Sequence, residues 1–487
     1  MAFTVGIVSV ITGIIFTVIV TRRLSPEELG LWTLIGSLVS YVVIAEPIIS
    51  YWASRQIARG KKVGRTALAT STIFSTAATG VYFIAAILVS LQIKADLFPI
   101  LLAAALVPIT FINNTLSGIS LGHKPHATSF SIVAYEISKL PLGFLLVYIV
   151  NLGVAGAIVA TVVASIIRMI VLLAMNREQL VHKITKEFTK LWLRLSWIPL
   201  YSSGTGFIFT LDVLVYSILT NSLIGLAFWG VANAVANVVN HSGQISQALY
   251  PKLLATEKKE FAEENLKKLF FFAIPILAAA IVFAKPALHI LNPIYIDGVF
   301  IVYLLSFRSL AYILLNFFFN IIGAYEKIDI DKGATFKMYI KSKLFFLPTL
   351  NYVMSISYVG TLGIFLSMFK ETANETELVN IWSTILLIVT LPFTIYGIIQ
   401  VKRKLGIGLP YRVIIKYSTI AFFTSLFILF ILENFLTYTR SIYDFLPQVI
   451  PIILIGGMIY FGIAYLFDKS TREFLKSIIN EMKHKQT

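Results

Sequence analysis

Amide side chains recur at helical spacing within one apolar stretch of the sequence. They are Asn233, Asn237, Asn240 and Gln244, at positions i, i+4, i+7 and i+11, and are called the amide stripe below. Lipid offers no hydrogen-bonding groups, so such a stripe inside a membrane helix must face water or other helices. We interpret it as the lining of a hydrated cavity. The alternative is hydrogen bonding between helices, worth about 1 kcal/mol per bond.

Ionisable side chains also lie within apolar stretches, where an unpaired charge is costly and therefore faces a partner or a cavity. These residues are Glu46, Glu136, Lys139, Arg168, Asp212, Lys285 and Arg308. Glu136 and Lys139, at i,i+3, are expected to neutralise each other. Arg308 is the deepest, and Tyr312 and Asn316 follow it at i+4 steps along one helix face. The other five charges leave a small cationic excess.

Several of these polar residues have simpler alternative explanations. Arg168 and Lys285 lie near predicted helix ends, so their long side chains can reach the membrane surface. Glu46 precedes Pro47, which predicts a helix break, and such a break marks either a binding site or a plain kink. His241, beside the amide stripe, is interpreted as a packed histidine and not as a metal ligand.

The composition indicates that these residues are held by membrane helices. The chain has 487 residues, of which 57% are hydrophobic and 13% charged, with a mean hydropathy of +0.84. A soluble protein of this size lacks the interior to bury so many apolar side chains. There is no cysteine, which excludes disulfides, thiol catalysis and cysteine-based metal sites. The sequence therefore predicts an all-α, polytopic membrane protein.

Apolar runs long enough to cross a bilayer as helices recur fourteen times. Their connections are short. The predicted spans are 5–21, 26–53, 67–92, 98–121, 127–150, 154–175, 195–220, 222–250, 269–291, 297–323, 344–368, 377–399, 412–434 and 447–467.

The distribution of positive charge predicts the orientation of these spans. Of the 40 Lys and Arg residues, 31 fall in segments on one side and five in segments on the other. Cytoplasmic loops carry the excess of Lys and Arg, so both termini are predicted inside and residues 370–377 outside. The net charge of +16 is thus a topology signal and does not indicate nucleic-acid binding. The tail after Asp468 has an amphipathic pattern, and we expect it to lie on the acidic inner leaflet.

A weak internal repeat suggests two halves. Gly13–Thr17 resembles Gly206–Thr210, and the two segments would run in the same direction across the membrane. Transporters with two such halves bind substrate between them. We therefore predict two six-helix lobes and a C-terminal extension of two helices with an amphipathic tail. Their boundaries are 1–194 for the first lobe, 195–402 for the second, and 403–487 for the extension.

The first predicted hairpin carries a motif. Arg23-Leu24-Ser25-Pro26-Glu27-Glu28-Leu29-Gly30 joins the first two spans, and the second opens with Leu31-Trp32. Ser25 and Glu28 also form a capping box, with Pro26 at the first helical position. In this motif and in its helix count, the chain resembles the multidrug/oligosaccharidyl-lipid/polysaccharide (MOP) flippase superfamily. It is most similar to the flippases of polysaccharide repeat units, which move lipid-linked sugars.

The resemblance implies a fold like that of the multidrug and toxic compound extrusion (MATE) transporters, and alternating access around a cationic cavity. The substrate would be an oligosaccharide on polyprenyl or dolichyl phosphate or pyrophosphate. Arginine binds two phosphate oxygens at once, so Arg308 is the first candidate contact. Arg22, Arg23 and Arg55 are candidate contacts at the two mouths of the cavity. The amide stripe, Tyr312 and Asn316 would then contact sugar hydroxyls.

The resemblance also implies a coupling cation, either H⁺ or Na⁺. Superfamily members often place a cation-binding carboxylate on the seventh helix, where this chain has Asp212. Asn351 is the candidate second ligand, from the eleventh predicted span. Carboxylate and amide oxygens suit a hard cation, whereas a proton needs the carboxylate alone.

Three other functions remain open at this point. A multidrug/cation antiporter of the same superfamily would have an acidic cavity. A membrane polysaccharide polymerase or ligase would need a long outside loop, and none is predicted. A scaffold without transport would not need an amide-lined interior. We expect no enzyme activity and no cofactor, because the sequence has no phosphate-binding glycine loop and its acidic pair Asp329 and Asp331 lies in a predicted cytoplasmic loop.

Overall fold

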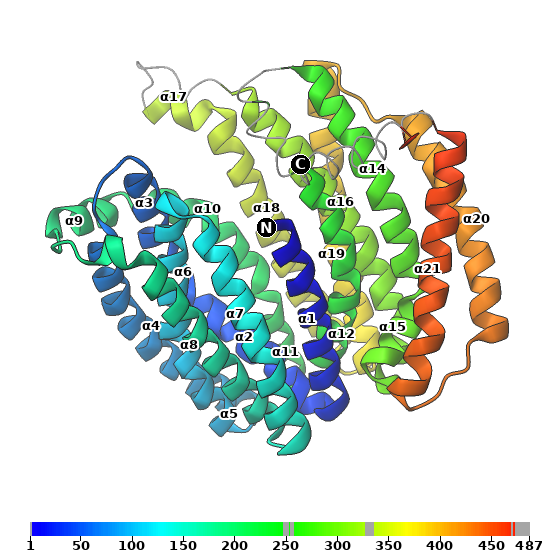
Figure 1. Cartoon of the computed structure of the whole chain (residues 1–487), viewed down its shortest axis with the longest axis horizontal. Coiled ribbons are helices and arrows are strands. Elements are labelled where there is room, and N and C mark those ends of the chain that lie inside the picture. The colour runs from blue at the N-terminus through cyan, green and yellow to red at the C-terminus, as the bar shows by residue number, and fades with distance from the viewer. Residues whose placement is uncertain (1, 247–252, 254–257, 327–335, 469–470, 473–487) are drawn as a thin grey trace, which may run out of the picture. The chain divides into compact units, whose positions relative to one another are not determined.

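The structure is a computed structural model of the whole chain, and helices joined by short irregular segments make up the residues that it describes (Figure 1). It describes every residue except 1, 247–252, 254–257, 327–335, 469–470 and 473–487. The described residues contain no β-strand. The predicted all-α class is therefore confirmed.

The helices follow one another with short connections. Up to residue 246 they are α1 (Ala2–Arg23), α2 (Pro26–Val43), α3 (Pro47–Ala58), α4 (Gly64–Ile93), α5 (Leu97–Leu102), η1 (Ala103–Ala105), α6 (Leu106–His123), α7 (His126–Gly143), η2 (Phe144–Ile149), α8 (Gly153–Leu180), α9 (Lys186–Arg194), α10 (Trp197–Thr210), α11 (Asp212–Thr220), α12 (Ile224–Ala236) and η3 (Asn237–Ser246). Beyond it they are α14 (Lys259–Val282), α15 (Ala284–Leu291), η4 (Pro293–Gly298), α16 (Val299–Ala324), α17 (Phe336–Lys341), α18 (Lys343–Phe369), α19 (Glu375–Leu405), α20 (Tyr411–Phe435) and α21 (Ile442–Phe467).

The helices form two compact units. Unit 1 comprises residues 1–230 and 348–385, and unit 2 comprises residues 231–347 and 386–487. Contacts thus group α10, α11 and parts of α12, α18 and α19 with the N-terminal helices. The lobe boundaries drawn from the sequence follow the order of the spans, and they stay a prediction.

Eleven helices among the described residues are long and apolar enough to cross a membrane. The bent pair of α2 and α3 raises this count to 12 if it forms one span. The two remaining predicted spans, 5–21 and 222–250, correspond to α1 and to α12 followed by η3. A multi-pass membrane protein is therefore confirmed, while the number fourteen stays a prediction.

The local signals in the first hairpin work as predicted. The Ser25 hydroxyl accepts a hydrogen bond from the Glu28 N–H at 3.2 Å, and the Glu28 carboxylate accepts one from the Ser25 N–H at 3.0 Å. This capping box gives hydrogen-bond acceptors to two backbone N–H groups that have none within the helix, so α2 begins at Pro26. The predicted break before Pro47 is also present, because α2 and α3 meet at 59°.

Candidate functional site

Arg308 lies on α16 in unit 2, with its side chain half-buried. Its guanidinium carbon is 4.5 Å from the centre of the Tyr312 ring, one turn along the helix. Such a cation–π contact orients the planar guanidinium group. Asn316, the next residue in the predicted series, is exposed. The predicted face of Arg308, Tyr312 and Asn316 therefore runs from a half-buried cation to an exposed amide.

The sequence predicts one continuous α-helix for the amide stripe, but the stripe lies on two successive helices of different type. α12 ends at Ala236, and the chain continues as a 3₁₀ helix from Asn237. A 3₁₀ helix has three residues per turn, so Asn237 and Asn240 are stacked one turn apart. The Asn240 amide donates to Asn237 Oδ1 at 2.6 Å. Asn233 and Asn237 are exposed, and the Gln244 side chain lies outside the described residues.

The amide stripe and Arg308 belong to neighbouring elements of unit 2. η3 packs against α16. At Gly243 a Cβ atom would lie 3.4 Å from side-chain atoms of Ile313, so the two helices approach closely there. Unit 2 thus brings together the helices that carry the predicted phosphate contact and the predicted sugar contacts.

The three arginines predicted at the cavity mouths all lie in unit 1. The Arg23 guanidinium carbon lies 3.7 Å from the centre of the Tyr148 ring. Arg55 donates to the Tyr51 hydroxyl at 2.8 Å. Arg22 is half-buried, whereas Arg23 and Arg55 are exposed. Aromatic side chains therefore hold Arg23 and Arg55 in place, and their role as substrate contacts stays a prediction.

Asp212 is buried at the start of α11, with 5% of its surface exposed. Its Oδ2 accepts a hydrogen bond from the Tyr358 hydroxyl of α18 at 2.7 Å. The same hydroxyl accepts one from the Trp382 indole N–H of α19 at 2.6 Å. Trp382 also stacks on Trp229, with ring centres 3.9 Å apart. An Asp–Tyr–Trp chain thus joins α11, α18 and α19 within unit 1.

Sequence reasoning missed Tyr358, the partner of Asp212, and Trp382, the partner of Tyr358. It proposed Asn351, which lies two helical turns before Tyr358 on α18 and makes no hydrogen bond to Asp212. Ser355, one turn after Asn351, donates instead to the Thr205 carbonyl at 3.1 Å. The one available signal was the helical register of Tyr358, which shares the Asn351 face after seven residues.

The other charges within the spans have local partners. Glu136 accepts a hydrogen bond from the Thr12 hydroxyl at 2.9 Å. The Lys139 ammonium lies 4.0 Å from the centre of the Phe16 ring. Arg168 donates to the Ser117 hydroxyl at 3.2 Å. Glu136 and Lys139 thus each contact a side chain of α1, and their neutralisation of each other stays a prediction.

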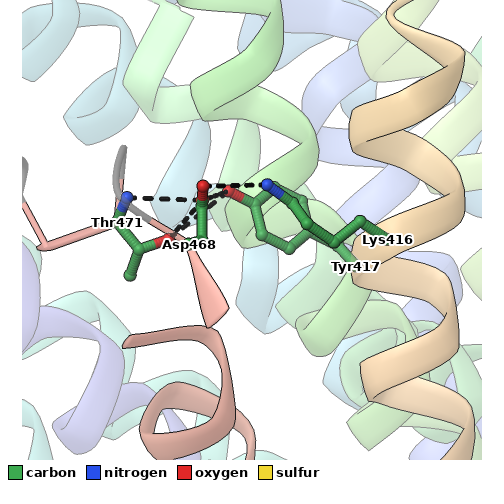
Figure 2. A network of polar contacts seen from close by, with 4 residues as sticks. All are labelled: Lys416, Tyr417, Asp468 and Thr471. Carbon is green, nitrogen blue, oxygen red and sulfur yellow. Dashed lines mark hydrogen bonds and ion pairs between the residues drawn. The ribbon is translucent and has the colours of Figure 1, made fainter. Parts of the chain in front are cut away.

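Asp468 follows α21 directly and anchors the start of the tail in unit 2, as Figure 2 shows. It accepts hydrogen bonds from the Tyr417 and Thr471 hydroxyls at 2.6 and 2.7 Å, and it pairs with the Lys416 ammonium at 2.9 Å. Burial opposes its ionisation. The hydrogen bonds and the lysine charge outweigh this and lower the pKa of the Asp468 carboxyl. Most of the predicted amphipathic tail, residues 473–487, lies outside the described residues.

An apolar cavity of about 200 Å³ lies among α14, α20 and α21, which stand side by side in Figure 1. Pro275, Ile428 and Tyr460 are among its lining residues, and no charged residue is. The cavity therefore suits an apolar group and offers no charged partner for a phosphate.

Comparisons with known proteins agree on one class. Residues 1–256 match the model of a family described as polysaccharide biosynthesis protein. No curated protein sequence matches the chain. Among solved structures, the lipid II flippase MurJ, in an inward closed conformation, has a TM-score of 0.68 at 14% identity, covering 97% of this chain and 99% of that one. An inward-facing multidrug resistance MATE family transporter of the MOP superfamily has a TM-score of 0.59 at 14% identity, covering 81% and 95%.

The fold and these matches define a polytopic membrane protein with the fold of the lipid II flippase MurJ and of a MATE family transporter. The family model covers more than half of the sequence. The chain belongs to the polysaccharide biosynthesis protein family.

Proposed function

We propose that the protein flips a lipid-linked oligosaccharide from the inner to the outer leaflet by alternating access. The observation that carries the proposal is membership of a polysaccharide biosynthesis family in a chain whose fold is that of a transporter. Sugars for such polymers are assembled on a lipid carrier, so a membrane transporter in this family must handle a large polar group with an apolar anchor.

The charges within the spans support an anionic substrate. A phosphate or pyrophosphate at membrane depth needs a cation to offset its loss of water. Arg308 is cationic, half-buried and oriented by Tyr312. We propose that it binds the headgroup, with Arg22, Arg23 and Arg55 as contacts on entry and exit. A multidrug/cation antiporter needs an acidic cavity, and the cationic excess within the spans disfavours it.

The exposed amides supply groups that match a sugar. Asn233, Asn237 and Asn316 each offer a donor and an acceptor, as hydroxyl groups require. We propose that they contact the sugar together with Asn240, Gln244 and Tyr312. Because several weak contacts share this task, each replacement is expected to have a smaller effect than the loss of Arg308.

The proposed mechanism also includes the finer topology and a driving ion. The proposal assigns fourteen spans, two lobes at 1–194 and 195–402, an extension at 403–487, and both termini in the cytoplasm. The Lys and Arg distribution supports this orientation. Asp212 is proposed to bind the coupling cation, H⁺ or Na⁺, with support from its burial beside Tyr358.

Reconstitution tests the proposal. The purified chain would be placed in liposomes with a lipid-linked oligosaccharide, and the outer-leaflet fraction would be followed by its accessibility to an impermeant glycosidase. Liposomes with Arg308→Ala protein serve as the matched control. Translocation above that control is expected. Equal accessibility with wild-type, Arg308→Ala and empty liposomes, across phosphate and pyrophosphate carriers, would refute the proposed function.

A further inference from the structure

Glu46 is a buried carboxyl group at the break between α2 and α3. Only 3% of its surface is exposed. It precedes Pro47, which has no N–H to continue the helical hydrogen bonds, and the two helices meet there at 59°. The proposed cation site at Asp212 does not use this residue. A buried acid at a helix break therefore needs its own explanation.

Hydroxyl groups from three helices surround the Glu46 carboxyl. Thr115 of α6 lies 2.9 Å from Oε1, and Ser50 of α3 lies 3.0 Å from Oε2. Behind Thr115, the Ser71 hydroxyl of α4 is 2.9 Å away, and Ser71 in turn reaches the Phe111 carbonyl at 3.5 Å. The result is a chain of polar groups that runs from Glu46 to a backbone acceptor.

No charged side chain among the described residues reaches this carboxyl, whose described side-chain partners are the Thr115 and Ser50 hydroxyls. Ionisable groups on the surrounding helices either make other contacts or lie near helix ends. Arg55 contacts Tyr51, Arg168 contacts Ser117, and Asp212 contacts Tyr358. The remainder are Glu27, Glu28, Tyr41, Arg65, Tyr82, His123, Arg177, Glu178, Tyr201, Tyr216, and the residues of α9, Lys186, Glu187, Lys190 and Arg194.

The chain of hydroxyls suits a carboxyl that carries a proton. A hydroxyl donates one hydrogen, so Thr115 can donate to either Glu46 or Ser71, but not to both. If Glu46 is protonated, it donates to Thr115, Thr115 donates to Ser71, and Ser71 donates to the Phe111 carbonyl. Every hydrogen then has an acceptor. If Glu46 is ionised, the direction reverses and a negative charge is left at membrane depth without a cation.

The position of Glu46 at the helix break links proton binding there to the angle between α2 and α3. α3 is held tightly on α6, because a Cβ atom at Gly118 would lie 2.9 Å from the Ser50 side chain, and one at Gly122 would lie 2.8 Å from the Ser54 carbonyl. Residues 44–46 form turns instead of a regular helix. A change in the carboxyl is therefore most easily absorbed by α2 turning about this break.

We propose that Glu46 is a proton-binding site whose occupancy sets the bend between α2 and α3. The bound species is H⁺ and not Na⁺, because Thr115 and Ser50 stand at direct hydrogen-bond distance from the carboxyl oxygens and leave no room for a cation between them. The proton's use as a driving force rests on the proposed transport function. Its binding to Glu46 does not.

Infrared spectroscopy of the purified full chain tests the binding directly. A protonated carboxyl has a carbonyl stretch that a carboxylate lacks, and we expect such a band to disappear as the pH is raised. Glu46→Gln should remove it. Glu136→Gln, which replaces a buried carboxyl on α7 of the same unit, should leave it in place. Thr115→Val should shift its frequency, because Thr115 is the partner of the protonated group.

Distances between labels test the bend. The chain has no cysteine, so Gly36→Cys on α2 and Ala58→Cys on α3 give two labelling positions, both exposed. We expect the label separation to change with pH in the wild-type background and to stay at its low-pH value in Glu46→Gln. The Glu136→Gln background should keep the pH response.

Clear outcomes would overturn the proposal. A pH-dependent carboxyl band or label separation that is the same in Glu46→Gln and wild type would exclude Glu46 as the titrating group. Loss of the band on addition of Na⁺ at constant pH would assign the site to a metal cation instead. Both measurements need no substrate. A failed flipping assay would therefore refute the proposed function and leave the proton site standing.

Discussion

Tyr358→Phe is expected to destabilise the protein measurably, because one hydroxyl joins three helices of unit 1. Tyr358 is fully buried, and its hydroxyl donates to Asp212 at 2.7 Å and accepts from Trp382 at 2.6 Å. Phenylalanine fills nearly the same volume, so no large cavity forms. The effect should come from the hydrogen bonds alone.

The magnitude follows from those two bonds. The donation to Asp212 is worth about 1.5–3 kcal/mol if the carboxyl is ionised and about 1 kcal/mol if it is neutral. Leaving the buried Trp382 N–H without its acceptor costs about 1–3 kcal/mol. Hydrogen bonds between membrane helices average about 0.6 kcal/mol, with a maximum near 1.7 kcal/mol. The membrane values weigh more here; two bonds on that scale amount to about 1–3.5 kcal/mol, and we expect a loss of about 2 kcal/mol.

Tyr82→Phe is the matched control for this measurement. Tyr82 is also fully buried in unit 1, and its hydroxyl makes one hydrogen bond, to the Ile100 carbonyl at 2.9 Å. Its removal should cost about 1 kcal/mol. Reversible denaturation in lipid or mixed micelles would give both free energies. A Tyr358→Phe variant no less stable than Tyr82→Phe would refute the idea that the Asp–Tyr–Trp chain holds these helices together.

Four further predictions concern transport, coupling, topology and pH. Arg308→Ala should abolish flipping in liposomes and Arg308→Lys should restore part of it, because lysine lacks the planar fork; a native rate in Arg308→Ala would remove it from the site. Asp212→Asn should slow gradient-driven transport while the protein stays folded, and unchanged gradient dependence would exclude Asp212 from coupling. In the cysteine-free chain, Lys186→Cys should resist an impermeant external reagent that labels Glu371→Cys, and the opposite pattern would refute the fourteen-span topology. The lowered pKa of Asp468 means that its stabilising contacts are present above about pH 4 and are lost as the pH falls; Asp468→Asn should therefore unfold more easily at pH 7 and depend less on acid, as a pH series of unfolding midpoints would reveal.

Local sequence signals predicted the elements of the fold well. The capping box at Ser25 and Glu28 correctly predicted the start of α2, and Pro47 after Glu46 correctly predicted the break before α3. Both features depend on residues within one turn of each other, so the sequence contains all the information they need. The all-α class and most of the spans follow in the same way from apolar runs of sufficient length.

Contacts between distant helices were not predictable from spacing. Tyr358 lies 146 residues from Asp212, whereas the sequence pattern favoured Asn351, which is two turns from Tyr358 on α18. The continuous helix expected for the amide stripe is absent for a different reason. Its spacing fits an α-helix, but the chain changes to a 3₁₀ helix at Asn237, and a single sequence gives no signal for that change.

Hydroxyl groups illustrate which polar residues in a membrane helix indicate a site. Thr17, Thr33 and many other Ser and Thr residues donate to the carbonyl four residues earlier, which satisfies them within their own helix. Such residues are compatible with lipid on every side. Thr115 and Tyr358 differ, because each contacts the carboxyl group of another helix.

This difference bears on function. A hydroxyl bonded within its helix keeps its partner whatever the neighbouring helices do. A hydroxyl bonded to a buried acid must rearrange when the acid gains or loses a proton, or when the helices separate. We therefore expect conformational change to involve Glu46 through Thr115 and Asp212 through Tyr358, which contact them. In sequence these two residues look like any Thr or Tyr in an apolar run, and their partners alone distinguish them.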